Sequence, residues 1–271
     1  MNYYSSPVPG LIPTLRKPGI FCLVIIMVIM GIILPAHGAE SPLESGQRSN
    51  LTLNTAQTPP RTRPDGSGFQ DIIIRKALGR LGIPVQIEHL PSERAMINAN
   101  EGIDDGVLVR VAGLEEIYPN LIRVPEQVTT FEFSAFTKTI NPPLRNWEDL
   151  KPYHVGIICG WKILEIKLTG VQSLTRVKDE VALFSLLAGD RVDFIVYDRM
   201  QGLALMEAQH LQNIRILEPP LAVKPMYLYL NKKHQDLVPQ VGEALREMRV
   251  SGLIDRITAE STKNRRPFAE N

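Results

Sequence analysis

The chain has 271 residues, of which 44% are hydrophobic, and a formal net charge of +1 at pH 7. A chain of this length can bury a large core, either as one long domain or as two small lobes. The near-neutral charge and the lack of a long basic run argue against nucleic acid as a partner.

The N-terminal segment has the order of features of a secretory signal. Arg16 and Lys17 form a positive flank, Ile20 to Leu34 is an uncharged apolar stretch, and small residues follow up to Ala39. The apolar stretch is shorter than the ~20 residues that a membrane-spanning helix needs. We therefore predict a cleaved signal peptide over residues 1–39 and export to the periplasm, with an uncleaved membrane anchor as the alternative.

The next part of the chain alternates short strands with helices. The hydrophobic patterns predict strands at Leu51–Thr55, Val85–His89 and Gly106–Val109, with helices at Phe69–Leu81 and Glu93–Ala99 between them. Ser92 is the expected N-cap of the second helix. A β-α-β-α-β order predicts a mostly parallel sheet.

A second unit with the same order follows. Its predicted strands are His154–Ile158, Val171–Leu174, Phe194–Tyr197 and Ile214–Leu217, and its helices are Trp161–Leu168, Lys178–Leu187 and Gln201–His210. The repeated order predicts a second, smaller α/β unit.

Two further strands lie where the chain passes between these units. They are Thr129–Thr137 and Leu221–Leu230, and Pro225 suits an edge position in the latter. An amphipathic helix from Leu237 to Met248 and a short final helix follow. We predict lobe 1 from residues 40–138 and 221–258, lobe 2 from residues 139–220, and a polar tail at 259–271. Two crossings between two lobes are typical of a hinge.

Two stretches are built alike and end in opposite charges. Met96–Arg110 and Leu183–Asp198 each run from a helical pattern through Gly and acidic residues into a short apolar strand. Ligands of open α/β sheets bind outside the carboxyl ends of such strands. Arg110 and Asp198 could therefore grip a small zwitterion between two α/β units. Alternatively, both residues cap strands at a solvated edge.

Catalytic and metal-binding signals are weak. The histidines beyond the signal peptide have no metal-ligand spacing, and there is no G-x-S-x-G or P-loop motif. Cys159, the only cysteine after residue 39, cannot form an internal disulfide. A buried small hydrophobe is the favoured interpretation of it over an activated thiol. We predict no enzymatic activity, no cofactor and no metal.

Five segments in sequence carry a resemblance to a known family. They are Pro59-Pro60 with Asp65–Phe69, Asn100–Gly106, Trp147–Leu150 with Val155–Ile157, Leu186–Asp198, and Leu237–Ile257. Their order and spacing resemble the extracytoplasmic solute-binding proteins of the amino-acid type, which feed ABC transporters. The resemblance spans residues 51–258. It implies an α/β, two-lobed periplasmic-binding-protein type II fold with a mostly parallel sheet in each lobe and two hinge crossings.

The resemblance also implies roles for single residues. An acid at the position of Asp198 receives the amino group of the ligand. The family's carboxylate-binding Arg has no counterpart in Val111–Glu116, and Arg110 could take over with its bidentate fork. The second-lobe turn reads Gly160-Trp161-Lys162, where the family has Gly followed by Ser or Thr. These departures weigh against an ordinary α-amino acid as the ligand.

Several of these residues have a second interpretation. Trp161 is either an aromatic wall of the cleft or a buried core residue. Arg110 could instead form a salt bridge with Asp104 or Glu93. Lys162 lies at a helix start, where a cation is unfavourable, so a ligand or an acidic neighbour should compensate. Arg94, at a strand-to-helix turn, is a further candidate for the rim of the cleft.

We therefore predict a monomeric periplasmic solute-binding protein. It should capture a small polar, carboxylate-bearing, amino-acid-like molecule between its lobes for an ABC permease, through Asp198, Arg110, Trp161, Arg94, Gly160 and Lys162. One alternative is presentation of the ligand to a membrane sensor without a transport role. Another is a dehydratase or other lyase on the same fold, with Glu93 or Asp198 as its acid.

Overall fold

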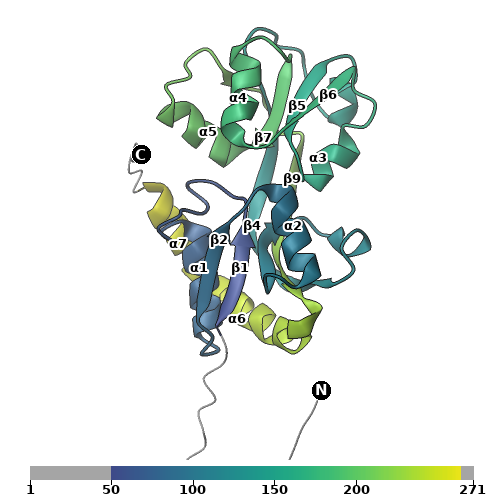
Figure 1. Cartoon of the computed structure of the whole chain (residues 1–271). Helices are drawn as coiled ribbons and strands as arrows, with labels where there is room; N and C mark the ends of the chain where they lie inside the picture. Colours follow the sequence, from purple (N-terminus) through teal and green to yellow (C-terminus); the bar gives the residue numbers. More distant parts are fainter. Residues whose placement is uncertain (1–49, 264–271) are drawn as a thin grey trace, which may run out of the picture. The chain divides into compact units, whose positions relative to one another are not determined.

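The computed structural model describes residues 50–263 (Figure 1). The predicted signal peptide lies outside these residues. The strands are β1 (Leu51–Thr55), β2 (Val85–His89), β3 (Gly106–Arg110), β4 (Leu121–Thr137), β5 (His154–Ile158), β6 (Ser173–Val177), β7 (Phe194–Asp198), β8 (Arg215–Ile216) and β9 (Ala222–Asn231). They form one sheet in the order β2-β1-β3-β9-β4-β7-β5-β6, with β8 beside β4.

Helices cover this sheet. The α-helices are α1 (Phe69–Gly79), α2 (Ser92–Glu101), α3 (Lys162–Lys167), α4 (Glu180–Ala188), α5 (Arg199–Ala208), α6 (Val238–Val250) and α7 (Leu253–Lys263). Three 3₁₀ turns are η1 (Leu114–Glu116), η2 (Trp147–Leu150) and η3 (Lys232–Leu237). The α/β class predicted from the sequence is confirmed.

The sheet is mixed, because the crossing strands run against their neighbours. β1 is parallel to β2 and β3, and β5 is parallel to β6 and β7. β9 is antiparallel to β3 and β4, and β4 is antiparallel to β7 and β8. A mostly parallel sheet therefore describes only the outer strands of each lobe.

β4 and β9 connect the two lobes seen in Figure 1. They pair with each other from Leu121 opposite Asn231 to Phe133 opposite Ala222, and the far end of β4 then pairs with β7. β9 is thus an interior strand from Tyr227 to Leu230, and Pro225 lies on the preceding stretch, which is an edge as predicted. Pro225 is tolerated because β3 pairs with β9 only at Tyr227 and beyond, which leaves Pro225 paired on its β4 side alone.

Lobe 1 contains β1 to β3 with α1, α2, α6 and α7, and lobe 2 contains β5 to β7 with α3, α4 and α5 (Figure 1). The largest buried cluster includes residues of both lobes, among them Phe69 and Leu108 from lobe 1 and Val155 and Phe194 from lobe 2. The lobes are therefore joined by packed apolar surface as well as by the crossing strands.

Most helix ends differ from the prediction by a few residues, and two of these differences affect the cavity wall and the predicted tail. The N-cap of α2 is Pro91, not Ser92, so Ser92 is the first helical residue and its hydroxyl makes no cap bond. α7 continues to Lys263, so the predicted polar tail begins inside a helix. Proline at the N-cap leaves the first N–H groups of α2 without a side-chain partner.

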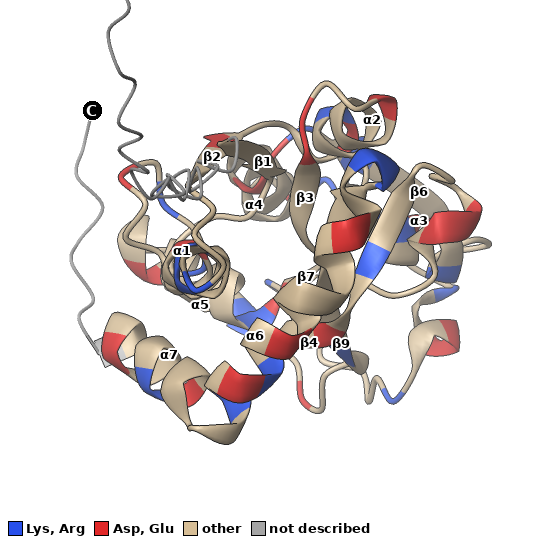
Figure 2. Cartoon of the chain, turned by 90° about the horizontal axis from the view of Figure 1, so that it is seen from below, with Lys and Arg blue, Asp and Glu red and all other residues tan. Residues whose placement is uncertain are grey.

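Among residues 50–263, no helix combines the length and the hydrophobicity needed to cross a membrane. Figure 2 shows acidic and basic residues intermixed along helices such as α3, α6 and α7. This mixture agrees with the near-neutral charge of the sequence.

Candidate functional site

A small cavity lies between the lobes beside the crossing strands. Its volume is about 30 Å³, which is room for one or two water molecules. Lobe 1 contributes residues from β1 to η1, lobe 2 contributes the β5–α3 turn, and the crossing strands add apolar side chains. The lining residues are Gln57, Ser92, Arg110, Val111, Leu114, Phe131, Phe133, Gly160, Trp161, Lys162, Ile163 and Met226.

Arg110, the last residue of β3, brings an unsatisfied cation to this cavity. Its side chain is buried, with the residue 6% exposed. Nε lies 3.1 Å from the sulfur of Met96 and Nη1 lies 3.4 Å from the Val109 carbonyl, both weak contacts. Nη2 has no hydrogen-bond partner in the described part of the chain. Burial lowers the pKa of Arg110 to about 10, so the group stays charged at neutral pH.

Two more buried polar groups on the cavity wall lack partners. The Ser92 hydroxyl and the Gln57 Oε1 form no hydrogen bond to any residue from 50 to 263. Ser92 begins α2, whose first N–H groups and positive helix dipole favour an anion. Unpaired buried polar atoms each cost about 1–3 kcal/mol. The Arg110 Nη2 and the Ser92 hydroxyl are donors and, with a helix N-terminus, form a cradle for an anionic group, whereas the Gln57 oxygen is an acceptor that would need a donor from the ligand.

Aromatic rings form the opposite wall. Trp161 is mostly buried, at 8% exposed, and still lines the cavity. Its ring centroid lies 6.0 Å from that of Phe133, 6.1 Å from that of Phe131 and 5.0 Å from that of Tyr197. Trp161 is therefore a buried core residue that also lines the cavity.

The β5–α3 turn touches lobe 1 directly. Gly160 has φ of +84°, and a Cβ there would lie 2.5 Å from the backbone nitrogen of Glu93. Next to it, Lys162 donates to Glu93 Oε2 at 2.6 Å and to Glu165 Oε2 at 3.0 Å. Burial opposes the charge of Lys162, but these two carboxylates outweigh it and hold its pKa above the ordinary value. Of the two compensations expected for Lys162, a ligand or an acidic neighbour, the acidic neighbour is present, and the pair with Glu93 joins the lobes.

Asp198 lies elsewhere, in a salt bridge inside the protein. It is fully buried at the end of β7, with its two oxygens 2.8 Å from Nε and Nη2 of Arg61. Its Oδ1 also accepts from the Gln201 backbone at the start of α5. Arg61 further donates to the Thr130 carbonyl and stacks 3.8 Å from the centroid of Phe131. Asp198 therefore caps a helix and binds a cation of the protein, and it does not line the cavity.

The remaining candidate residues are placed as follows. Arg94 is exposed and does not line the cavity. The alternative salt bridges of Arg110 to Asp104 or Glu93 are not formed, because Asp104 accepts from Asn54 and Glu93 pairs with Lys162. The structure thus brings Arg110, Gly160, Trp161 and Lys162 together and leaves Arg94 and Asp198 apart from them.

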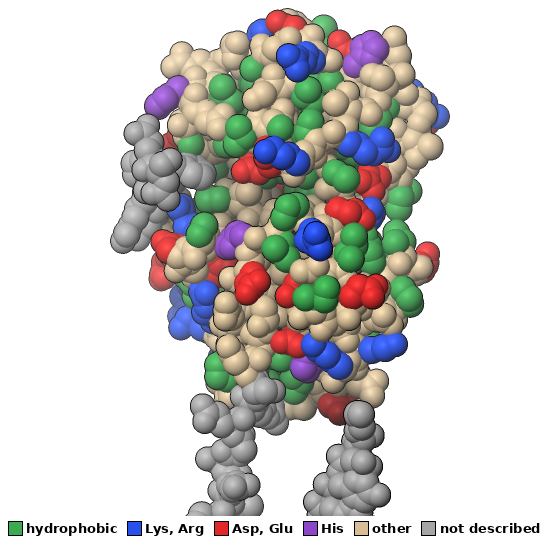
Figure 3. All heavy atoms as spheres, in the orientation of Figure 1, with side chains coloured by type: hydrophobic (Ala, Val, Ile, Leu, Met, Phe, Trp, Pro, Cys, Tyr) green, Lys and Arg blue, Asp and Glu red, His purple; other side chains and the backbone are tan. Residues whose placement is uncertain are grey.

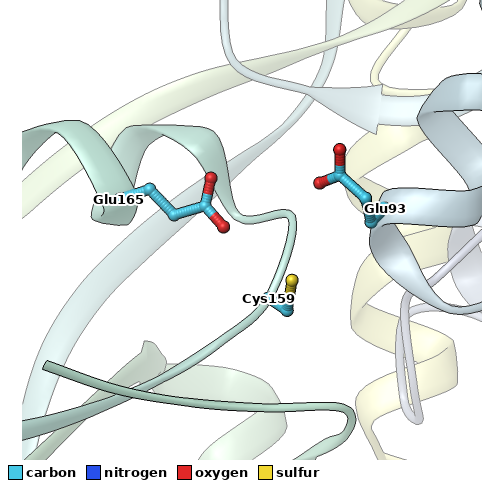
Figure 4. Close-up of side chains that lie close together, drawn as sticks. All are labelled: Glu93, Cys159 and Glu165. Atoms are coloured by element: carbon cyan, nitrogen blue, oxygen red, sulfur yellow. The ribbon is translucent and has the colours of Figure 1, made fainter.

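Three potential metal ligands also meet at the mouth of this region. Figure 4 shows Glu93, Cys159 and Glu165 pointing toward one another, and their ligand atoms lie within 4.8 Å of each other. The Lys162 ammonium already hydrogen-bonds to both carboxylates. The Lys162 ammonium therefore balances part of their charge, and Cys159 is exposed rather than buried as expected.

No motif or spacing in the sequence identifies Arg61 or Gln57 as a site residue, and Ser92 was expected only as a helix cap. Arg61 and Asp198 are 137 positions apart, and no spacing rule links them. The sequence feature that could have indicated a role for Arg61 is its position directly after Pro59-Pro60, in a loop whose other residues favour turns.

Comparisons with known proteins identify the fold. The GluR0 ligand-binding core in complex with L-glutamate has a TM-score of 0.70 at 15% identity, over 79% of this chain and 99% of that one. A histidine kinase sensor domain with similarity to periplasmic binding proteins has a TM-score of 0.69 at 17% identity, over 79% and 96%. A substrate-binding protein of an amino acid ABC transporter has a TM-score of 0.66 at 18% identity, over 80% and 100%.

Sequence similarity is weaker. An uncharacterised protein of Shewanella oneidensis is 25% identical over 243 residues, which are 86% of this chain and 90% of that protein. No protein-family model matches the sequence. The chain is therefore a divergent example of the periplasmic-binding-protein type II fold, as the resemblance implied, and its neighbours are binding proteins and sensor domains.

Proposed function

We propose that the protein captures a small carboxylate-bearing molecule between its two lobes, with Arg110 binding the carboxylate. The observation that carries this proposal is the unpaired, buried guanidinium of Arg110 in a cavity that both lobes line. A bidentate bond to a carboxylate would satisfy its free donor, and the Ser92 hydroxyl and the start of α2 lie on the same wall. Trp161 and Phe133 would exclude water from the bound group.

Lobe contacts support capture by closure. The Lys162–Glu93 ion pair and the contact of Gly160 with α2 join the lobes on the cavity side. The bond between the hydroxyls of Thr58 and Tyr197 joins them near Asp198. A ligand that bridges Arg110 and the second lobe would favour this closed arrangement by its differential affinity for it.

Thermal unfolding of the purified protein tests the proposal. The panel is acetate, butyrate, hexanoate, benzoate, common amino acids and simple amines. A carboxylate present at a hundred times its Kd should raise the unfolding free energy by about 2.7 kcal/mol. Arg110→Met should remove this stabilisation and leave the unliganded protein folded.

Arg94→Met is the matched control, because Arg94 is exposed on the same lobe and does not line the cavity. It should keep the full stabilisation. Stabilisation that persists in Arg110→Met, or that only amines produce, would contradict the proposal.

We further propose export by residues 1–39 and delivery of the ligand to an ABC permease. The fold of an amino acid ABC transporter's binding protein supports this role. Presentation to a membrane sensor is the second candidate, supported by the histidine kinase sensor domain of the same fold. Uptake of the radiolabelled carboxylate by cells with and without the gene separates the two. Loss of uptake favours transport, and unchanged uptake with a lost transcriptional response favours sensing.

A further inference from the structure

A second, larger cavity continues from the one at Arg110. Its volume is about 400 Å³, within the range of small-molecule sites. Val111, Leu114 and Ile163 line both cavities, so the two cavities are adjacent. The larger one is an open groove between the β3–η1 segment of lobe 1, α3 of lobe 2 and the start of β9.

Apolar side chains dominate this groove. Ile117 and Ile166 line it from the two lobes and are 47% and 59% exposed, which is unusual for isoleucine. Figure 3 shows hydrophobic side chains along the waist between the lobes. An apolar groove that leads to a buried guanidinium is suited to a molecule with a charged head and an apolar body.

The charges on both cavities have one sign. Arg110 and Lys162 line the inner cavity, and Lys167 and Lys224 line the groove. Among the described residues that line either cavity, there is no Asp or Glu. An ammonium group on the ligand would therefore find no free carboxylate, because Asp198 is buried against Arg61, and Glu93 and Glu165 are paired with Lys162. An unpaired ammonium would lose its hydration without compensation.

We infer that the ligand is an amphipathic monocarboxylate without an α-amino group. This inference rests on the function proposed above. The carboxylate binds Arg110, and the apolar body runs past Leu114 and Ile163 to Ile117 and Ile166. Arg61 sets this specificity by holding Asp198 in an internal ion pair. The lysines at the groove are exposed, so they contribute little to binding.

Affinities for a series of acids test the inference. Butyrate, hexanoate and octanoate should bind the purified protein with affinity rising three- to fourfold per methylene group until the groove is filled. Norleucine, which is hexanoate with an α-amino group, should bind at least tenfold more weakly than hexanoate. Tighter binding of norleucine, affinity independent of chain length, or tighter binding of octanedioate than of octanoate would overturn the inference.

These outcomes are separate from failure of the proposed function. That function fails if no carboxylate binds in a manner that Arg110→Met abolishes. The ligand class fails if carboxylates bind through Arg110 but follow one of the three contrary patterns.

A pair of identical substitutions tests the groove. Ile166→Asp should weaken octanoate binding at least tenfold and leave butyrate binding unchanged. Ile103→Asp is the control, since Ile103 is 67% exposed and does not line the groove. Both side chains are exposed, so both variants should fold. Equal octanoate affinities in the two variants would place the apolar body elsewhere.

Discussion

Two buried arginines in this protein have opposite surroundings. Arg61 is 1% exposed, and its guanidinium is used by Asp198, Thr129, Thr130 and the face of Phe131. Arg110 is similarly buried, but it has two weak contacts and an unpaired Nη2. Both lie where the lobes meet.

The difference in hydrogen bonding suggests that one arginine stabilises the fold and that the other is available to a ligand. A buried ion pair with full hydrogen bonding holds the structure strongly against loss of either partner. A buried cation whose N–H groups lack hydrogen-bond acceptors lowers the free energy of unfolding. Such destabilising groups are concentrated at functional sites, including ligand-binding sites. The difference is consistent with a structural role for Arg61 and with the binding role proposed for Arg110, whereas the resemblance had implied a ligand contact for Asp198.

The largest expected effect comes from the same substitution at both positions. Arg61→Met leaves the Asp198 carboxylate buried without its cation, and should lower the unfolding free energy by about 3–5 kcal/mol. Arg110→Met removes an unsatisfied charge, and should leave the unfolding free energy unchanged or raise it by about 1 kcal/mol. Denaturant unfolding of the unliganded proteins measures both.

The double variant Arg61→Met with Asp198→Asn is the control. It removes both charges and keeps an oxygen for the Gln201 backbone N–H, so it should recover at least half of the loss. A loss below about 1 kcal/mol in Arg61→Met would show that the two arginines do not differ as argued.

The loop that carries Arg61 gives the next effect. Asp71 Oδ2 accepts from the backbone of Arg63 at 2.8 Å and of Gly68 at 3.1 Å. Burial raises the pKa of Asp71 from 3.8 to about 6, and the two backbone bonds only partly oppose it. The folded protein thus binds this proton more tightly than the unfolded chain does. Its contribution to stability is complete below pH 3.8 and is lost as the pH rises through about 6.

Asp71→Asn should remove this dependence. Relative to the variant, the unsubstituted protein should lose up to roughly 3 kcal/mol of unfolding free energy between pH 4 and pH 7.5. Unfolding free energies of both proteins across this range give the difference, in which other titrating groups cancel. A difference that stays constant with pH would mean that Asp71 titrates normally.

The sequence predicted local structure better than contacts between distant residues. Leu51–Thr55, Val85–His89 and His154–Ile158 match their strands because alternating or continuous hydrophobic patterns are local signals. The predicted order of strands and helices likewise placed Arg110 at a strand end next to the cleft, because ligands of α/β sheets bind at the carboxyl ends of the strands. The ion pair of Arg61 with Asp198 could not be predicted, because only the tertiary fold brings the two residues together. A single charged residue in a sequence is more often on the surface than buried.

The smallest expected effect on the unfolding free energy comes from substitutions at glycines, one of which lines the Arg110 cavity. Gly160→Ala and Gly170→Ala both place alanine at positive φ, +84° and +90°, which costs about 1 kcal/mol each. Only at Gly160 would the new Cβ meet backbone, 2.5 Å from the nitrogen of Glu93, whereas no heavy atom lies within 4 Å at Gly170. Gly160→Ala should therefore hold the lobes apart at the Arg110 cavity and weaken carboxylate binding at least tenfold.

Gly170→Ala should bind the carboxylate normally, although its positive φ also costs about 1 kcal/mol of unfolding free energy. Titration of a carboxylate that stabilises the unsubstituted protein measures both affinities, and small-angle scattering at saturation measures compaction. Equal affinity in the two alanine variants would mean that the contact of Gly160 with α2 is not needed for capture. Weaker binding in Gly160→Ala alone would tie the Arg110 cavity to closure of the lobes, because the two variants share their backbone strain and differ only in the contact with lobe 1.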